Sequence, residues 1–291
     1  MAEWCRGDGA ATAAGRNNYG MPMWPCAALM SLVACGGQIG GRDDGAPDAS
    51  ADAFAHGDSL DFNGGAFEDR MNEAGEASDP TIVMSGAIVA LSSQSSFPLS
   101  DAQACVAQTS NCSVTDGQGA FSLNVRADAQ VAITIQRAGY TNVLVPIVTT
   151  EQDQVGWEIG TELASATTAK YANIGVTYPD ISTAFLAAFA STADGQQGEE
   201  GATFQLTPSA SGGPTYLDAS YVADPGATST STTGLVIASF SSPVTTVTIV
   251  YLPNTLPCSP SFGGWPAPGA NSVLVPLLAG FETHVGQECD P

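Results

Sequence analysis

The sequence predicts an all-β protein, with one or two antiparallel β-sandwiches following a disordered N-terminal region. Only 12% of the 291 residues are charged, while Gly (32 residues) and Pro (18 residues) are frequent. This composition suits short strands joined by turns better than long helices. From about residue 80 onward, short apolar and β-branched runs also alternate with turn residues, a pattern typical of antiparallel sandwiches.

The charge balance excludes one class of partner. Seven Lys and Arg residues stand against 29 Asp and Glu, for a formal net charge of −22. Nucleic acid is therefore not an expected partner, because phosphate binding needs clustered cations. An anionic membrane surface would repel the chain for the same reason. The charge is better suited to keeping an exposed protein soluble.

The N-terminal segment ends in a lipidation motif. Residues 21–35 are uncharged and largely apolar but too short to span a bilayer, and Leu32-Val33-Ala34-Cys35 resembles the lipobox of bacterial lipoprotein signal peptides. The resemblance implies that residues 1–34 are a cleaved signal peptide and that the Cys35 thiol carries a diacylglyceryl membrane anchor. Gly36, in place of the aspartate that signals inner-membrane retention, favours the outer membrane or cell surface. The alternative is a chance apolar run in a cytoplasmic protein.

Residues 35–79 form an acidic segment with two bases, Arg42 and Arg70. Low hydrophobicity and like charge cannot offset chain entropy, so the segment is expected to be disordered and extended. It would act as a spacer between the membrane and the folded modules. A calcium site is the alternative, but the segment contains no Asp-x-Asp-x-Asp-Gly loop.

Residues 80–150 are expected to form the first sandwich, with strands over 82–91, 98–106, 111–115, 120–125, 131–135 and 143–145. Asp116–Gly119 would supply a hairpin turn that directs Phe121 into the core. The order of features resembles the carboxypeptidase regulatory-like family, which implies a transthyretin-like fold. A generic immunoglobulin-like sandwich is the alternative. The residues that carry the resemblance are Gly86, Pro98-Leu99, Ala102, Thr115-Asp116, Gly119-x-Phe121-x-Leu123 and Gly139-Tyr140.

Residues 175–291 are expected to form a second, divergent sandwich that repeats the first. The segment at 201–206 echoes 101–104 with an offset of 100, and 230–234 echoes 115–119 with an offset of 115. The difference predicts a 15-residue insertion around 208–227. Strands are expected over 183–189, 246–251 and 272–276. Between the modules, residues 151–174 would be a linker whose short helix carries Ile159 and Leu163 on one side.

Four of the seven cysteines fall into two close groups within the predicted modules: Cys105 with Cys112, and Cys258 with Cys289. An even number of cysteines in an exported chain predicts disulfides. Four reduced, buried thiols are the alternative.

No catalytic, metal or cofactor site is predicted. The chain has two histidines, His56 in the acidic segment and His284 near the C-terminus, too few for the usual zinc or non-haem iron sites. A Ser-His-Asp triad could use only His284, and no Gly-x-Ser-x-Gly elbow precedes it. An exposed position on an edge strand is the expected role of His284.

Three aromatic residues are candidate ligand contacts. Trp265, Phe262 and Tyr216 lie in predicted loops of the second module, where exposed rings could stack on sugars or on a protein partner. The alternative is that they cover a small core. Together these features predict a non-catalytic envelope lipoprotein with a structural or recognition role, whose partner is an envelope protein or a glycan. A carbohydrate-binding surface lipoprotein is the alternative, and an accessory component of a secreted hydrolase is a third hypothesis.

Overall fold

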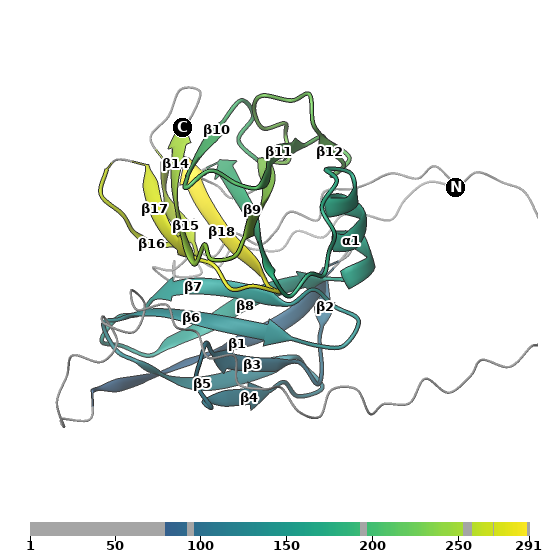
Figure 1. Cartoon of the computed structure of the whole chain (residues 1–291). Helices are drawn as coiled ribbons and strands as arrows, with labels where there is room; N and C mark the ends of the chain where they lie inside the picture. The colour runs from purple at the N-terminus through teal and green to yellow at the C-terminus, as the bar shows by residue number, and fades with distance from the viewer. Residues whose placement is uncertain (1–78, 92–95, 193–196, 253–257, 270, 290–291) are drawn as a thin grey trace, which may run out of the picture.

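The computed structural model describes residues 79–91, 96–192, 197–252, 258–269 and 271–289. Figure 1 shows two stacked β-sandwiches and one short helix, so the all-β sandwich prediction is confirmed. The expected signal peptide, the Cys35 anchor, His56 and nearly all of the acidic segment lie outside the described residues.

The first sandwich packs a four-stranded sheet against four strands of a larger sheet, around one core. Along β5 every second residue is buried, which includes Phe121 at 4% exposure, as the hairpin prediction required. All the predicted strands are present, although that over 98–106 is divided. One sheet contains β1 (Thr81–Leu91), β2 (Ser96–Pro98), β5 (Ala120–Arg126) and β8 (Gln154–Glu162), and the other β3 (Gln103–Val106), β4 (Cys112–Val114), β6 (Gln130–Gln136) and β7 (Val143–Val148).

The linker expectation is wrong in part, because β8 is a strand and not a helix. It pairs in parallel with β1, with Ile159 opposite Ile88, and Ile159 is fully buried in the core. The helix α1 begins later, at Ala164–Ala172, and Leu163 precedes it with 51% of its surface exposed. The four-residue spacing of Ile159 and Leu163 fits a helix, but pairing with a strand some 70 residues earlier overrides that local signal.

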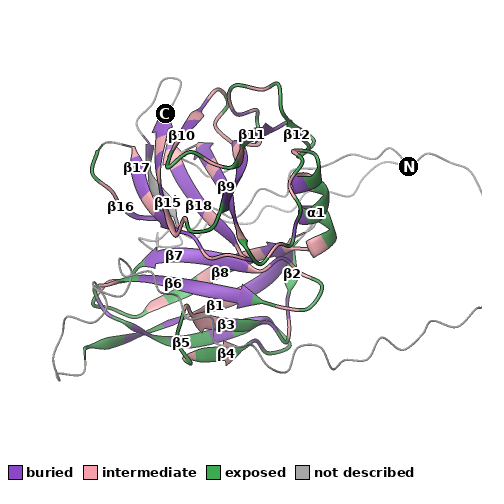
Figure 2. Ribbon diagram, viewed as in Figure 1, coloured by how far each residue is buried: buried purple, intermediate pink, exposed green. Residues whose placement is uncertain are grey.

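The second sandwich is built in the same way, and its three predicted strands are present. One layer contains β9 (Thr183–Thr192), β11 (Gly212–Leu217), β12 (Ala223–Asp224), β13 (Leu235–Ser241), β15 (Cys258–Phe262) and β18 (Glu282–Cys289). The other contains β10 (Thr203–Thr207), β14 (Thr246–Leu252), β16 (Trp265–Pro266) and β17 (Ser272–Pro276). Their facing sides are buried (Figure 2).

Matching hydrogen bonds recur in the two sandwiches at the positions of the sequence echo. The Thr115 hydroxyl accepts the backbone N–H of Ala102 at 2.9 Å, and the Thr230 hydroxyl accepts that of Ala202 at 2.9 Å. Strand register repeats as well. Gly86 of β1 lies opposite Phe121 of β5, as Ala188 of β9 lies opposite Val236 of β13. In each sandwich the last strand runs parallel to the first.

The predicted insertion around 208–227 contains β11 and β12. In the first sandwich the corresponding stretch contains β4, which pairs with β3. In the second, the inserted hairpin instead pairs through β11 with β13, in the opposite sheet. The insertion therefore widens the sheet on whose outer face α1 packs, through a cluster of Tyr171, Tyr178 and Phe185 with neighbouring side chains.

The two sandwiches share one sheet. The start of β18 pairs in parallel with β7, Glu282 opposite Val143 and Thr283 opposite Leu144. This pairing joins the β3–β4–β6–β7 sheet of the first sandwich to the β9–β18 sheet of the second, giving a ten-stranded sheet through the molecule (Figure 1). The sandwiches are therefore linked by backbone hydrogen bonds as well as by the chain that connects them.

Candidate functional site

A cluster of buried polar side chains lies where β18 meets β7 and α1. At its centre is Glu282, the first residue of β18, which is 1% exposed. One carboxylate oxygen accepts the Tyr171 hydroxyl at 3.0 Å, and the other lies 2.9 Å from Nε2 of His284. Glu282 and His284 share a face of β18 because side chains two residues apart on a strand point the same way. We call Glu282, His284, Lys170, Tyr171 and Glu162 the junction cluster.

The rest of the junction cluster comes from α1 and from the end of β8. Lys170, in the last turn of α1, forms an ion pair with Glu162. Glu162 also accepts the Thr167 hydroxyl at 2.7 Å. The cluster therefore connects the last strand of the first sandwich, the helix between the sandwiches and the last strand of the second (labelled β8, α1 and β18 in Figure 1).

Electrostatics keep Glu282 ionised despite its burial. Desolvation raises its pKa, but the nearby Lys170 charge and the hydrogen bonds from His284 and Tyr171 outweigh it and lower the pKa to about 2. Lys170 responds in the opposite sense: desolvation lowers its pKa, and the charges of Glu282 and Glu162 raise it above the usual value. Burial and the Glu282 charge raise the pKa of Tyr171. At neutral pH the centre is therefore a carboxylate held by a lysine and a neutral tyrosine.

This arrangement suits holding the sandwiches together better than chemistry on a substrate. Both Glu282 and Tyr171 are at most 1% exposed, so a substrate cannot reach the carboxylate or the hydroxyl. The Tyr171 hydroxyl also lies 3.1 Å from the backbone oxygen of Leu186 in β9. Removing one partner of such a buried charged cluster leaves an uncompensated charge, which makes the cluster sensitive to substitution.

The expectation for His284 is wrong, because β18 is an interior strand. It pairs with β9, β7 and β15, and the His284 side chain is only 12% exposed and bound to Glu282. Glu282, Lys170 and Tyr171 were not predicted as site residues from the sequence. The signal for Glu282 is an acid and a histidine two residues apart within an apolar segment, which places both on one strand face. The helical partners have no such local signal.

Trp265, proposed as a ligand contact, is instead buried at the junction at 5% exposure. Its indole N–H donates to the backbone oxygen of Val131 at 3.2 Å, and its ring packs with Ala132 and Leu144 of the first sandwich. The prediction of an exposed ring on a loop is therefore wrong. The sequence pattern around Trp265 is that of a loop, but the surface that covers it comes from residues more than 100 positions earlier.

Tyr216 is not exposed either. It lies in β11 at 5% exposure, and its hydroxyl accepts the backbone N–H of Phe204 at 3.1 Å. The ring is part of the second core, so it presents no face to a sugar. Phe262 ends β15, but its side chain lies outside the described part of the structure.

The predicted cysteine pairs form disulfides. Cys105 and Cys112 join β3 to β4, and Cys258 and Cys289 join β15 to β18. In both pairs the Cα atoms are 4.0 Å apart. Each disulfide therefore links directly opposite residues of an antiparallel strand pair, and the second ties a loop strand to the end of the fold.

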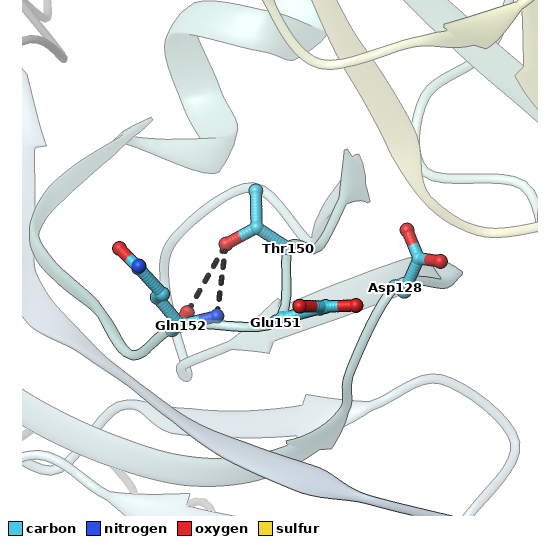
Figure 3. Close-up of a pocket in the computed structure, with 4 residues that line it drawn as sticks. All are labelled: Asp128, Thr150, Glu151 and Gln152. Atoms are coloured by element: carbon cyan, nitrogen blue, oxygen red, sulfur yellow. Dashed lines mark hydrogen bonds between the residues drawn. The ribbon is translucent and has the colours of Figure 1, made fainter.

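A shallow depression lies between the β5–β6 turn and the β7–β8 loop (Figure 3). It is lined by Asp128, Thr150, Glu151 and Gln152, and the Thr150 hydroxyl bonds only within its own loop, to the Gln152 backbone at 3.2 Å. Two exposed carboxylates without a base among the lining residues do not make a catalytic site.

Elsewhere in the described ranges, no group of three or more His, Cys, Asp or Glu side chains could hold a metal ion, and no helix is long and apolar enough to cross a bilayer.

No family model matches the chain, and no curated protein matches it. Among solved structures, a type II cohesin–X-dockerin complex from Acetivibrio cellulolyticus is 17% identical over 28% of this chain and 58% of that chain, with a TM-score of 0.25. The minor pilin GBS52 of Streptococcus agalactiae is 11% identical over 72% and 95% of the two chains, with a TM-score of 0.24. The shaft pilin SpaA of Lactobacillus rhamnosus GG is 11% identical over 72% and 98%, with a TM-score of 0.23. At these TM-scores, nothing about this chain rests on the likeness.

Proposed function

We propose that this protein is a non-catalytic lipoprotein of the cell envelope, anchored through Cys35, whose joined sandwiches serve a structural or recognition role. The outer membrane or the cell surface is the favoured location. In this proposal the acidic segment 36–79 is the spacer between the lipid and the folded part.

The observation that carries the structural role is the junction between the sandwiches. The β7–β18 pairing, the junction cluster and the buried Trp265 all cross it. A body fixed by three kinds of contact presents its surface in one orientation. It is poorly suited to the hinge motions by which enzymes close over substrates.

The two disulfides support an exported location. Disulfides form and persist in oxidising compartments and are rare in the cytosol, where thiols are kept reduced. Cys105–Cys112 and Cys258–Cys289 account for all the cysteines of the two sandwiches. The remaining three cysteines lie at or before position 35.

The anchor is tested by metabolic labelling with a palmitate analogue in a bacterial host, followed by membrane fractionation. We expect the wild-type chain to be labelled and to sediment with membranes, and Cys35→Ser to lose both properties. Cys26→Ser is the matched control, because position 26 lies in the segment that would be removed, and it should behave like the wild type. An unlabelled cytosolic protein whose first residue is Met1 would contradict the proposal.

The fixed arrangement is tested separately with spin labels on Ser122→Cys and Ser241→Cys, one in each sandwich, in a lipid-free background in which Cys5, Cys26 and Cys35 are all replaced by serine so that no other free thiol takes the label. We expect a single narrow distance distribution by double electron–electron resonance. A broad distribution would show that the sandwiches move independently, and it would contradict the structural role without bearing on the lipid anchor.

A further inference from the structure

Two core positions are aliphatic in the first sandwich and polar in the second. Gln287 of β18 lies opposite Ala190 of β9, as Ile159 of β8 lies opposite Ile88 of β1. By the same register, Tyr251 of β14 corresponds to a buried isoleucine of β6, Ile135, because β10 and β14 pair as β3 and β6 do. The repeat thus shows that two apolar core side chains have polar counterparts.

Both polar side chains are fully buried and unpaired. Gln287 and Tyr251 are 0% exposed. Within the described part of the chain, the side-chain oxygen and nitrogen of Gln287 have no hydrogen-bond partner, and neither does the hydroxyl of Tyr251. Buried polar groups in folded proteins are nearly always bonded to protein or to ordered water. Burial also raises the pKa of Tyr251, so its hydroxyl stays protonated and can both donate and accept.

The two groups lie at the same end of one core. Gln287 shares its strand face with Val285 and Cys289, both members of the second core. The Tyr251 ring packs edge-on against Phe204, with ring centroids 4.7 Å apart.

Asn271 connects the two strands at this end. Its backbone oxygen accepts the N–H of Tyr251 at 2.8 Å, and its side-chain oxygen accepts the N–H of Cys258 at 3.3 Å. Cys258 is disulfide-bonded to Cys289, which lies two residues beyond Gln287 on the same face of β18. Tyr251 and Gln287 therefore lie at the same end of the core between the two sheets.

We propose that the second sandwich contains an internal water site in which Gln287 and Tyr251 bind one or two water molecules. A carboxamide with two donors and one acceptor, together with a hydroxyl, offers the two to four partners that a buried water needs. The first sandwich has isoleucines at both places and no such site is expected there. The water would bond groups of both sheets, β18 in one layer and β14 in the other.

The direct test is nuclear Overhauser transfer between long-lived water and the Gln287 side-chain amide protons in the full-length, lipid-free protein. We expect a water cross-peak at Gln287 that is absent in Tyr251→Phe. The exposed side chain of Gln103 serves as the control, because its contact is with bulk water and should not respond to Tyr251→Phe. Absence of a long-lived water at Gln287 in the wild type would overturn the proposal, as would density for any other molecule between the two side chains in a crystal structure.

A double-mutant cycle gives an independent measurement. Gln287→Ile, which restores the first-sandwich residue type, and Tyr251→Phe should each raise the unfolding equilibrium constant by about tenfold, the usual effect of losing one hydrogen-bonded partner. The double variant should raise the unfolding equilibrium constant by much less than the product of the two single effects. Each single change leaves one polar side chain without its full set of partners, and the second change removes that side chain. If instead each single variant is more stable than the wild type and the effects multiply, the side chains bind no water.

Discussion

A single residue, Glu282, determines how the polar part of the junction works. Its carboxylate is almost fully buried, yet it stays ionised because Lys170, His284 and Tyr171 surround it. Attraction of this kind offsets the cost of desolvating a charge only when the geometry is complete. The cluster is therefore expected to be more important for the stability of the fold than an exposed ion pair.

Glu282→Gln tests this expectation, because the change removes the charge and nearly preserves the shape. We expect it to lower the free energy of unfolding by roughly 3 kcal/mol, since the change removes the buried negative charge that attracts Lys170 and bonds His284, and the ion pair of Lys170 with Glu162 only partly compensates. Urea unfolding measures the loss. Asp79→Asn is the matched control: it breaks the exposed Arg126–Asp79 ion pair and should cost less than about 1 kcal/mol. Equal effects of the two variants would contradict the assigned role.

The same residue predicts a pH dependence of stability. Its pKa in the folded protein, about 2, is below its ordinary value of 4.5, so the unfolded chain binds the proton first as the pH falls. The stability that Glu282 contributes is complete above about pH 4.5 and is lost as the pH falls toward 2. Between pH 6 and pH 2 we expect the wild type to lose roughly 3 kcal/mol more than Glu282→Gln. Parallel pH profiles of the two proteins would be the contradicting result.

At the scale of elements, one buried threonine in each sandwich bonds two backbone groups just before a strand of the core. Thr115 accepts the N–H of Ala102 and donates to the Leu99 carbonyl at 2.6 Å. Thr230 does the same with the N–H of Ala202 and the Glu199 carbonyl at 2.5 Å. Each threonine thus fixes the segment that enters a strand, β3 in the first sandwich and β10 in the second. The same geometry at both places explains why the sequence echo between 115–119 and 230–234 is detectable.

Thr115→Val and Thr230→Val should therefore destabilise the protein by similar amounts, about 1–3 kcal/mol each, because each leaves a buried backbone N–H and a shielded carbonyl without the threonine hydroxyl. Chemical denaturation of the two variants measures this. Thr207→Val, at an exposed position of β10, should change the stability by less than about 0.5 kcal/mol. If only one of the two threonine variants lowered the stability, the two sandwiches would not be equivalent at this position.

Elements whose signals are local could be predicted from the sequence, and those that depend on distant pairing could not. Alternation in 120–125 predicted β5, and the close cysteine groups predicted both disulfides. The strand β8 was missed because its partner β1 precedes it by some 70 residues. The candidate site was missed in the same way, because Lys170 and Tyr171 on α1 meet Glu282 more than 100 residues later.

At the scale of the whole molecule, two sandwiches with the same strand pairing are joined into one unit by a shared sheet. In the second copy the last strand, β18, uses its outer edge to pair with β7 and β15. Both β18 and the corresponding strand of the first sandwich, β8, pair with the first strand of their own sandwich. Among the described strands, β8 has no further partner on its other edge. The segment that contains Trp265 covers the outer edge of β17 and places its ring on the first sandwich. The outer edge of β18 and the segment that contains Trp265 thus distinguish the second sandwich from the first and also join the two.

Trp265→Ala tests whether this joining makes the protein unfold as one unit. The substitution removes a ring packed on Ala132 and Leu144 and the bond to Val131. It should cost about 3–5 kcal/mol and split the single calorimetric transition expected of the wild type into two, because the second sandwich keeps its own core and disulfide. Phe97→Ala, at a half-exposed side chain, should leave one transition. If Trp265→Ala still melts in a single transition near the wild-type temperature, the indole does not couple the sandwiches, and the shared sheet and the junction cluster must hold them together.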